Sequence, residues 1–195
     1  EADSSFIKPV TRDSVIVAKF IETDFFDSVI AHTYINPQLD ESEKLVFAAK
    51  PQIQGLFVPL TRTDSSYKKI WGGYLPDSSR FAFALIVEVI NRVNGNTCLN
   101  YFYLNNEWAV SIVLDNRYHP IEYAKNPNPV YQPSGGLDCW LDCMYIKQHE
   151  CQQDWYCYIS CILTPEACIM AWTLDCLLIC HGINTDPGGG ASQAK

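Results

Sequence analysis

The cysteines are the residues best placed to do chemistry in this chain. Nine occur among 195 residues, and only Cys98 precedes position 139. The other eight fall within 42 residues, and an even number at this density predicts a disulfide framework rather than catalytic thiols. They are Cys139, Cys143, Cys151, Cys157, Cys161, Cys168, Cys176 and Cys180. Because disulfides persist in oxidising compartments, we expect the chain to be secreted or held at a cell surface.

The spacing of these cysteines indicates how the disulfides are arranged. Three pairs have three residues between them: Cys139/Cys143, Cys157/Cys161 and Cys176/Cys180. In a helix, positions i and i+4 share one face, so each pair presents two thiols along that face. Two such faces on antiparallel helices can be joined by two disulfides. Cys139–Cys161 with Cys143–Cys157 is a natural hairpin, but the third pair competes for the second helix, and eight cysteines allow 105 pairings.

Other uses of the thiols are weaker interpretations. Zinc sites use similar Cys spacings, but eight thiols with His149 and His181 nearby do not resolve into sets of four, so we expect no metal. Cys98 is the odd cysteine if the other eight pair among themselves. It is then a buried free thiol, or it forms an interdomain or intermolecular disulfide.

No catalytic or nucleic-acid-binding pattern accompanies the cysteines. The four histidines are scattered, and no Ser/His/Asp or Cys/His arrangement can be recognised from spacing, so we expect no enzyme activity and no cofactor. The net charge is −8, whereas binding to nucleic acid requires Lys and Arg to neutralise phosphates. We therefore exclude nucleic acid as a partner.

The composition changes along the chain and predicts an α+β protein in four parts. Residues 1–125 form a β-rich domain with an antiparallel sheet and one covering helix. Residues 126–136 are a Pro- and Gly-rich linker. A disulfide-stapled helical module follows at residues 137–183, and residues 184–195 are a flexible tail. The chain begins at Glu1 rather than Met, which is typical of the end left by signal-peptide removal.

Each part is expected to have particular elements. The covering helix begins after Asp13, on the spacing of Ala18, Ile21, Phe25 and Val29, although a strand at residues 15–21 is the alternative. Strands are predicted at residues 45–48, 52–60, 67–74, 81–90, 98–104 and 108–114. Helices are predicted at residues 137–148, at 153–163, and from the Thr164-Pro165-Glu166 start signal to about position 180.

Three tryptophans in the helical module have two interpretations. Tryptophan suits a boundary between apolar and polar surroundings, such as a membrane interface or a partner surface. It also fills the core of a small domain. The residues concerned are Trp140, Trp155 and Trp172.

The layout resembles that of halocin-C8-type bacteriocin precursors. The resemblance rests on the dense cysteines, the domain order and apolar stretches such as Cys161-Ile-Leu and Leu177-Leu-Ile-Cys180. The cysteine spacings differ from that family, and this module is acidic and richer in Trp and Tyr. In that family a compact Cys-rich peptide is released by proteolysis and is antimicrobial, and the N-terminal part can act as its immunity partner. The Gly135-Gly136 step then marks a processing site, or simply a flexible joint.

Two main hypotheses follow. The first is a secreted bacteriocin-like precursor or toxin, whose C-terminal module acts on a membrane or a cell-surface receptor while the N-terminal domain carries or neutralises it. The alternative is a structural or surface-assembled subunit, fibre-forming or cross-linked by disulfides, that associates with itself. An extracellular enzyme with no recognisable site is a third option.

Overall fold

A computed structural model describes most of this 195-residue chain. The described residues are 6–33, 36–46, 53–62, 66–116, 119–128, 136–154, 157, 161 and 165–180. They form one large sheet with helices on both faces, which confirms the predicted α+β class with an antiparallel sheet. Among the helices in these ranges, none has the length and apolarity that spanning a membrane requires.

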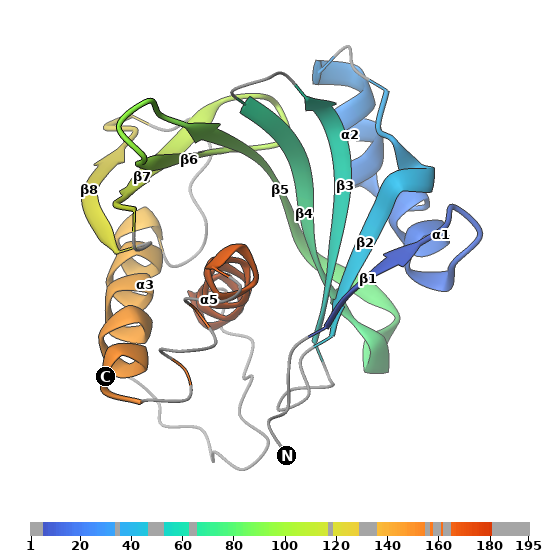
Figure 1. Cartoon of the computed structure of the whole chain (residues 1–195). Helices are drawn as coiled ribbons and strands as arrows, with labels where there is room; N and C mark the ends of the chain where they lie inside the picture. Colours follow the sequence, from blue (N-terminus) through green and yellow to red (C-terminus); the bar gives the residue numbers. More distant parts are fainter. Residues whose placement is uncertain are drawn as a thin grey trace.

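The sheet is an eight-stranded antiparallel meander, in which each strand pairs with its neighbours in the chain. It is strongly curved and arches over the C-terminal helices (Figure 1). The first and last strands, β1 and β8, are the two edges. In order, the strands are β1 (Phe6–Val10), β2 (Ser42–Val46), β3 (Gln54–Arg62), β4 (Ser66–Leu75), β5 (Arg80–Asn91), β6 (Thr97–Phe102), β7 (Trp108–Leu114) and β8 (Pro120–Lys125).

Both faces of the central strands are buried. Successive side chains of a strand point to opposite faces, so each strand supplies two cores. On the concave face the core includes Phe57, Trp71, Val87, Tyr101 and Ile112. On the convex face it includes Val58, Ile70 and Ile86. This double burial explains why β5 is almost continuously apolar in sequence.

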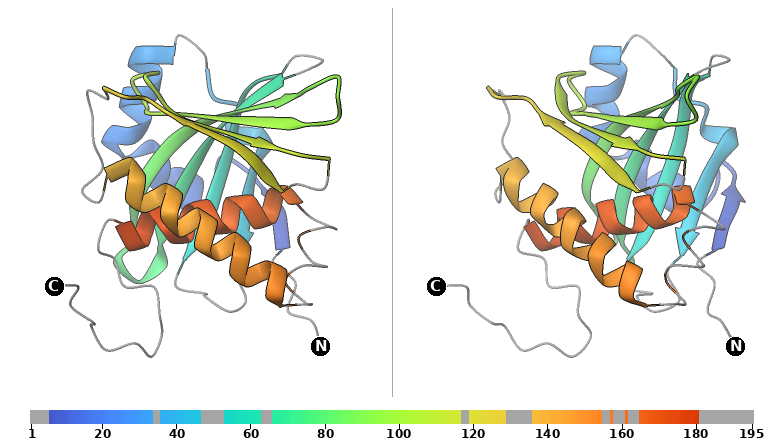
Figure 2. Two further views of the ribbon diagram at one scale, coloured as in Figure 1. Left: turned by 90° about the vertical axis from the view of Figure 1, so that its left-hand side faces the viewer. Right: turned by 60° about the vertical axis from the view of Figure 1, so that its left-hand side comes forward.

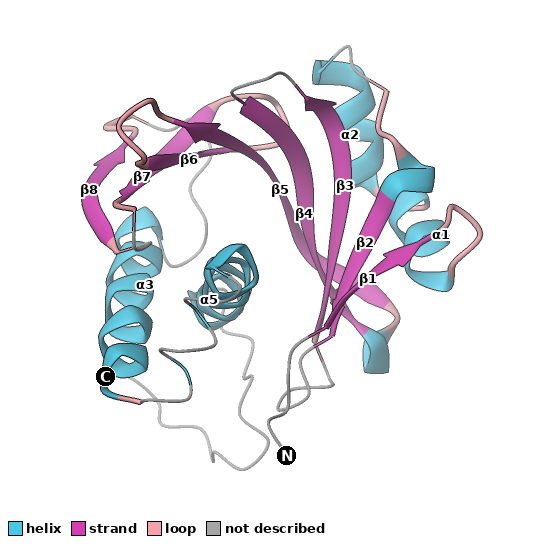
Figure 3. Cartoon of the chain, viewed as in Figure 1, coloured by secondary structure: helices cyan, strands magenta, loops and turns pink. Residues whose placement is uncertain are grey.

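Two helices, rather than the single one predicted, cover the convex face. They are α1 (Val15–Ile21) and α2 (Asp24–Thr33), and Figure 3 shows them outside the sheet. The break between them has a local cause at Thr23. Its hydroxyl donates to the Phe20 carbonyl at 2.6 Å and accepts a hydrogen bond from the Phe26 N–H at 3.3 Å, so it closes one helix and starts the next.

Two C-terminal helices, α3 (Gly136–Gln153) and α5 (Pro165–Cys180), lie inside the curve of the sheet. They cross one another beneath it (Figure 2). The start of α5 agrees with the Thr164-Pro165-Glu166 signal, whereas α3 continues about one turn beyond the predicted end. Most of the predicted helix at 153–163 lies outside the described residues, as do the tail and positions 129–135 of the linker.

The concave core contains residues from both sides of the predicted linker. Trp140, Met144, Ile169, Leu177 and Leu178 of the two helices belong to the same buried cluster as the concave face of the sheet. The four-part division of the sequence stays a prediction. The packing adds that the helical segment and the sheet together form one core.

Candidate functional site

The two C-terminal helices are joined by two disulfides at successive turns. Cys139 pairs with Cys180, and Cys143 pairs with Cys176, with Cα–Cα distances of 6.0 and 5.6 Å. The idea of two i,i+4 faces zipped together is therefore right. The sequence left the partners open, and the hairpin of the first and second Cys-x3-Cys pairs is not the one formed: the first pair joins the third. We call α3, α5 and these two disulfides the helix pair.

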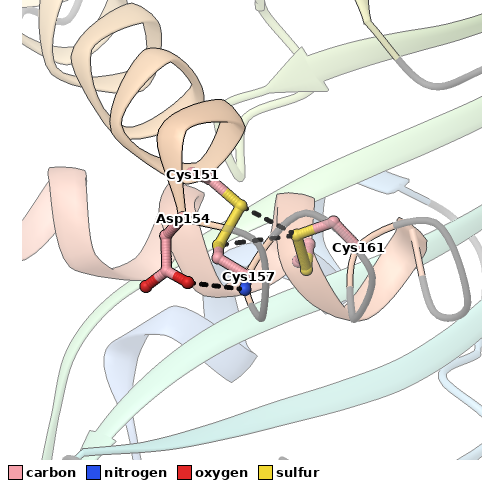
Figure 4. Close-up of a disulfide and its surroundings, with 5 residues drawn as sticks. Cys151, Asp154, Cys157 and Cys161 are labelled. Carbon is pink, nitrogen blue, oxygen red and sulfur yellow. Dashed lines mark hydrogen bonds between the residues drawn. A yellow bond between two sulfur atoms is a disulfide. The ribbon is translucent and has the colours of Figure 1, made fainter.

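The remaining four module cysteines form two short-range disulfides near the end of α3. Cys151 pairs with Cys157 and Cys161 with Cys168. Figure 4 shows how closely they lie: the Cys161 Sγ is 3.5 Å from that of Cys151 and 4.0 Å from that of Cys157. The Cys157 N–H donates to Asp154 Oδ1 at 3.4 Å. A metal binds thiolates, and sulfurs held in disulfides cannot provide them, so this oxidised cluster is a cross-link rather than a metal centre.

An aromatic chain connects the sheet to the helix pair. Phe57, Trp71, Tyr101 and Trp140 pack edge to face in succession, with ring centroids 5.8, 5.9 and 4.8 Å apart. Such pairs contribute about 0.5–1.5 kcal/mol each beyond the area they bury. The last contact joins β6 to α3, so these rings hold the helix pair against the concave face.

The same tyrosine contributes the polar link to the other helix. The Tyr101 hydroxyl and Thr173 Oγ1 of α5 are 3.2 Å apart, and both side chains are fully buried. Thr173 also donates to the Met144 sulfur at 3.9 Å. Burial raises the pKa of the Tyr101 phenol well above its ordinary value of about 10. The phenol therefore stays protonated and available as a hydrogen-bond donor.

The outer side of the helix pair has a different character. Tyr145, Ile146 and Ile179 are exposed there, at 61%, 53% and 44% of their surface. Lys147 and Asp175 form an ion pair of 3.0 Å between the helices. Lys125 of β8 pairs with Asp138 of α3, which ties the sheet edge to the start of the helix pair. The helix pair is thus apolar toward the sheet and mixed on its outer face.

The predicted contact residues have different positions. Trp140 is 2% exposed and fills the core, rather than lying at a surface that could contact a membrane or partner. Trp172 is partly buried and packs against the same core. Trp155 and Gly135 lie outside the described residues, and Gly136 is the first residue of α3. Cys98 is a buried free thiol, 4% exposed, whose Sγ donates to Asn100 Oδ1 at 3.4 Å.

Comparison with known proteins does not extend this description. No protein-family model, curated protein or solved structure matches the chain. The resemblance to halocin-C8-type precursors therefore stays a prediction from the residues.

Sequence reasoning missed the residues that make this contact. Tyr101, Thr173 and Met144 were not singled out, because none belongs to a motif. The alternation of β6 places Leu99 and Tyr101 on one face, but it does not indicate which helix lies opposite. Only the long-range packing brings Tyr101 and Thr173 together.

Proposed function

We propose that this chain is a secreted bacteriocin-like precursor or toxin. The helix pair is its active part, acting on a membrane or a cell-surface receptor. The curved sheet with α1 and α2 is the carrier or immunity partner. The protein acts by contact and not by catalysis.

The observation that carries the proposal is the burial of the apolar side of the helix pair in the concave face of the sheet. Trp140, Met144, Leu177 and Leu178 are each at most 5% exposed in that position. On separation these side chains would form one continuous apolar surface. Such a surface, with tryptophan beside aliphatic residues, suits the boundary between lipid headgroups and acyl chains.

The disulfides support release of the module as a defined unit. All four link cysteines within residues 139–180, and none ties the module covalently to the sheet. If the chain were cut between the end of β8 and the start of α3, the helix pair would stay cross-linked within itself and could dissociate from the sheet. Four disulfides also favour an oxidising compartment.

The test uses the full chain with a protease recognition sequence placed within residues 129–135. The protein is added, cut or uncut, to dye-loaded phosphatidylcholine vesicles and to growing bacteria. We expect leakage or growth inhibition only after cleavage, since the sheet hides the apolar side beforehand. The control carries a scrambled recognition sequence and receives the same protease. Complete cleavage with neither leakage nor inhibition would reject the proposal.

A self-associating structural subunit is the second candidate, and the edge strand β8 favours it. Its side chains are largely exposed, including Ile121 at 57% and Tyr123 at 37%. An open edge with exposed apolar side chains can pair with another copy. Sedimentation velocity of the wild type and of Ile121→Lys tests this. A concentration-dependent oligomer lost in the variant is expected, and a monomer at every concentration would exclude it.

A further inference from the structure

A cavity of about 350 Å³ lies where the sheet separates between β5 and β6. The pairing of these strands ends at Ile86 and Phe102, so the first half of β5 pairs only with β4 among the described strands. The cavity occupies the space that opens between this free stretch of β5 and the turn from β6 to β7. It is lined from β5 by Ala82 to Leu85 and from the turn by Tyr103 to Asn105.

The walls come from both layers of the protein. Phe25 of α2 lines the cavity on the convex side, whereas Tyr101, Trp140 and Leu177 line it on the concave side. Most of the lining is aliphatic or aromatic. Pockets of about 300–1,000 Å³ with this character are typical of sites for small apolar ligands.

One lining residue has a polar group that a ligand could satisfy. The indole N–H of Trp140 is buried and has no hydrogen-bond partner among the residues that the structure describes. Buried donors are nearly always paired, so an acceptor oxygen from a ligand would correct this deficit. None of the described residues around the cavity is charged. A carboxylate would therefore lose water without gaining a counter-ion, which favours a neutral carbonyl.

We propose that this cavity binds a neutral, medium-length hydrocarbon chain carrying one carbonyl group, whose oxygen accepts the Trp140 N–H. A water molecule takes about 30 Å³ in the liquid, and a methylene group needs similar space, so the cavity accommodates about ten such groups. The cavity exists only while the helix pair stays on the sheet. Ligand binding there therefore does not depend on the release of the helix pair that the proposed function requires. The ligand would contact β5, β6 and both members of the pair at once.

The experiment titrates 2-decanone into the full, oxidised protein and follows heat and tryptophan fluorescence. One saturable site is expected. Ala84 and Ala109 both line the cavity, one from the convex core and one from the concave core. Ala84→Leu and Ala109→Leu should each fill part of the cavity and weaken binding at least tenfold, while circular dichroism confirms the fold. Absence of saturable binding to the wild type would overturn the proposal. So would undiminished binding by both folded variants, because the ligand would then lie elsewhere.

Two tryptophan variants test the donor. Trp140→Phe should weaken 2-decanone binding about fivefold, which corresponds to one neutral hydrogen bond. Trp71→Phe is the matched control, because the Trp71 indole N–H is also buried without a partner in the described part of the chain, but Trp71 does not line this cavity. Equal affinities of the two variants would overturn Trp140 as the donor. Decanoate that binds as tightly as 2-decanone at neutral pH would overturn the neutral ligand class.

Discussion

The Tyr101 hydroxyl lies 3.2 Å from Thr173 Oγ1, and this contact joins β6 of the sheet to α5. The two residues are 72 positions apart in sequence, and both side chains are fully buried. Tyr101 also packs between Trp71 and Trp140. One residue thus links the sheet to both members of the helix pair.

Tyr101→Phe should lower the free energy of unfolding by about 1–2 kcal/mol, because it leaves the buried Thr173 hydroxyl without this partner while keeping the ring contacts. Urea denaturation of the oxidised protein measures the change. The double variant Tyr101→Phe/Thr173→Val should cost less than the sum of the two single variants. Strictly additive effects would mean that the two hydroxyls do not interact.

Alkaline pH should weaken the fold through the same tyrosine. Burial raises the pKa of the Tyr101 phenol above the unfolded value of about 10, so the folded state holds this proton more tightly. The stability that the raised pKa of Tyr101 contributes is fully present below about pH 10. It is lost as pH rises from there toward the pKa of the folded state. The stability difference between wild type and Tyr101→Phe should therefore stay constant from about pH 8 to about pH 10 and shrink from there to about pH 11.

The measurement is made in a Cys98→Ala background, because this free cysteine could otherwise exchange with the disulfides once the protein unfolds. A stability difference that stays constant over the whole range would contradict the assignment to Tyr101.

Gly73 should be intolerant of a side chain. A Cβ atom at this position would lie 2.5 Å from the Phe83 ring on the neighbouring strand. A Cβ atom on Gly72 would likewise lie 2.9 Å from the Phe81 ring. We expect Gly73→Ala to destabilise the protein by about 1–3 kcal/mol through overpacking. Thermal unfolding measures this. In a Phe83→Ala background the same substitution should cost little, and an unchanged cost there would show that Phe83 is not the cause.

The long-range and short-range disulfides should differ in their contribution to stability. The loop-entropy relation assigns about 4 kcal/mol to Cys139–Cys180, whose cysteines are 41 positions apart, and about 2 kcal/mol to Cys151–Cys157, whose cysteines are 6 apart. Each pair is replaced by two alanines in a background that already lacks Cys143–Cys176, because this second link, whose cysteines are 33 positions apart, would otherwise close nearly the same loop as Cys139–Cys180. Urea unfolding then compares the two losses. A larger loss for the short-range pair would show that native-state contacts, and not loop length, dominate.

The sequence predicted the fold where local chemistry decides it. Strong alternation and turn residues located the central strands, and the Thr164-Pro165-Glu166 signal located the start of α5. The edge strands β1 and β8 were missed. β1 contains Pro9, β8 begins at Pro120, and β8 is largely exposed, so neither has the apolar alternation of a buried strand.

The disulfide partners could not be predicted for a different reason. Three Cys-x3-Cys pairs have the same spacing, so helix geometry alone makes them equivalent partners. In the folded protein, the residues around the third pair distinguish it. Leu177 and Leu178 lie beside Cys176 and are buried in the concave core, which brings α5 to α3. Selection of the partner therefore depends on the curved sheet, which is remote in sequence.

The strictly sequential order of the eight strands has a consequence for how the molecule is assembled. Every strand pairing joins neighbours along the chain, so the sheet can form stepwise from its N-terminal end as the polypeptide emerges. The residues that cover its concave face come after all eight strands. During synthesis the sheet would present an uncovered apolar trough until α3 and α5 arrive. Disulfide formation between α3 and α5 would then be the last step, and it would fix the two helices against a concave face that has already formed.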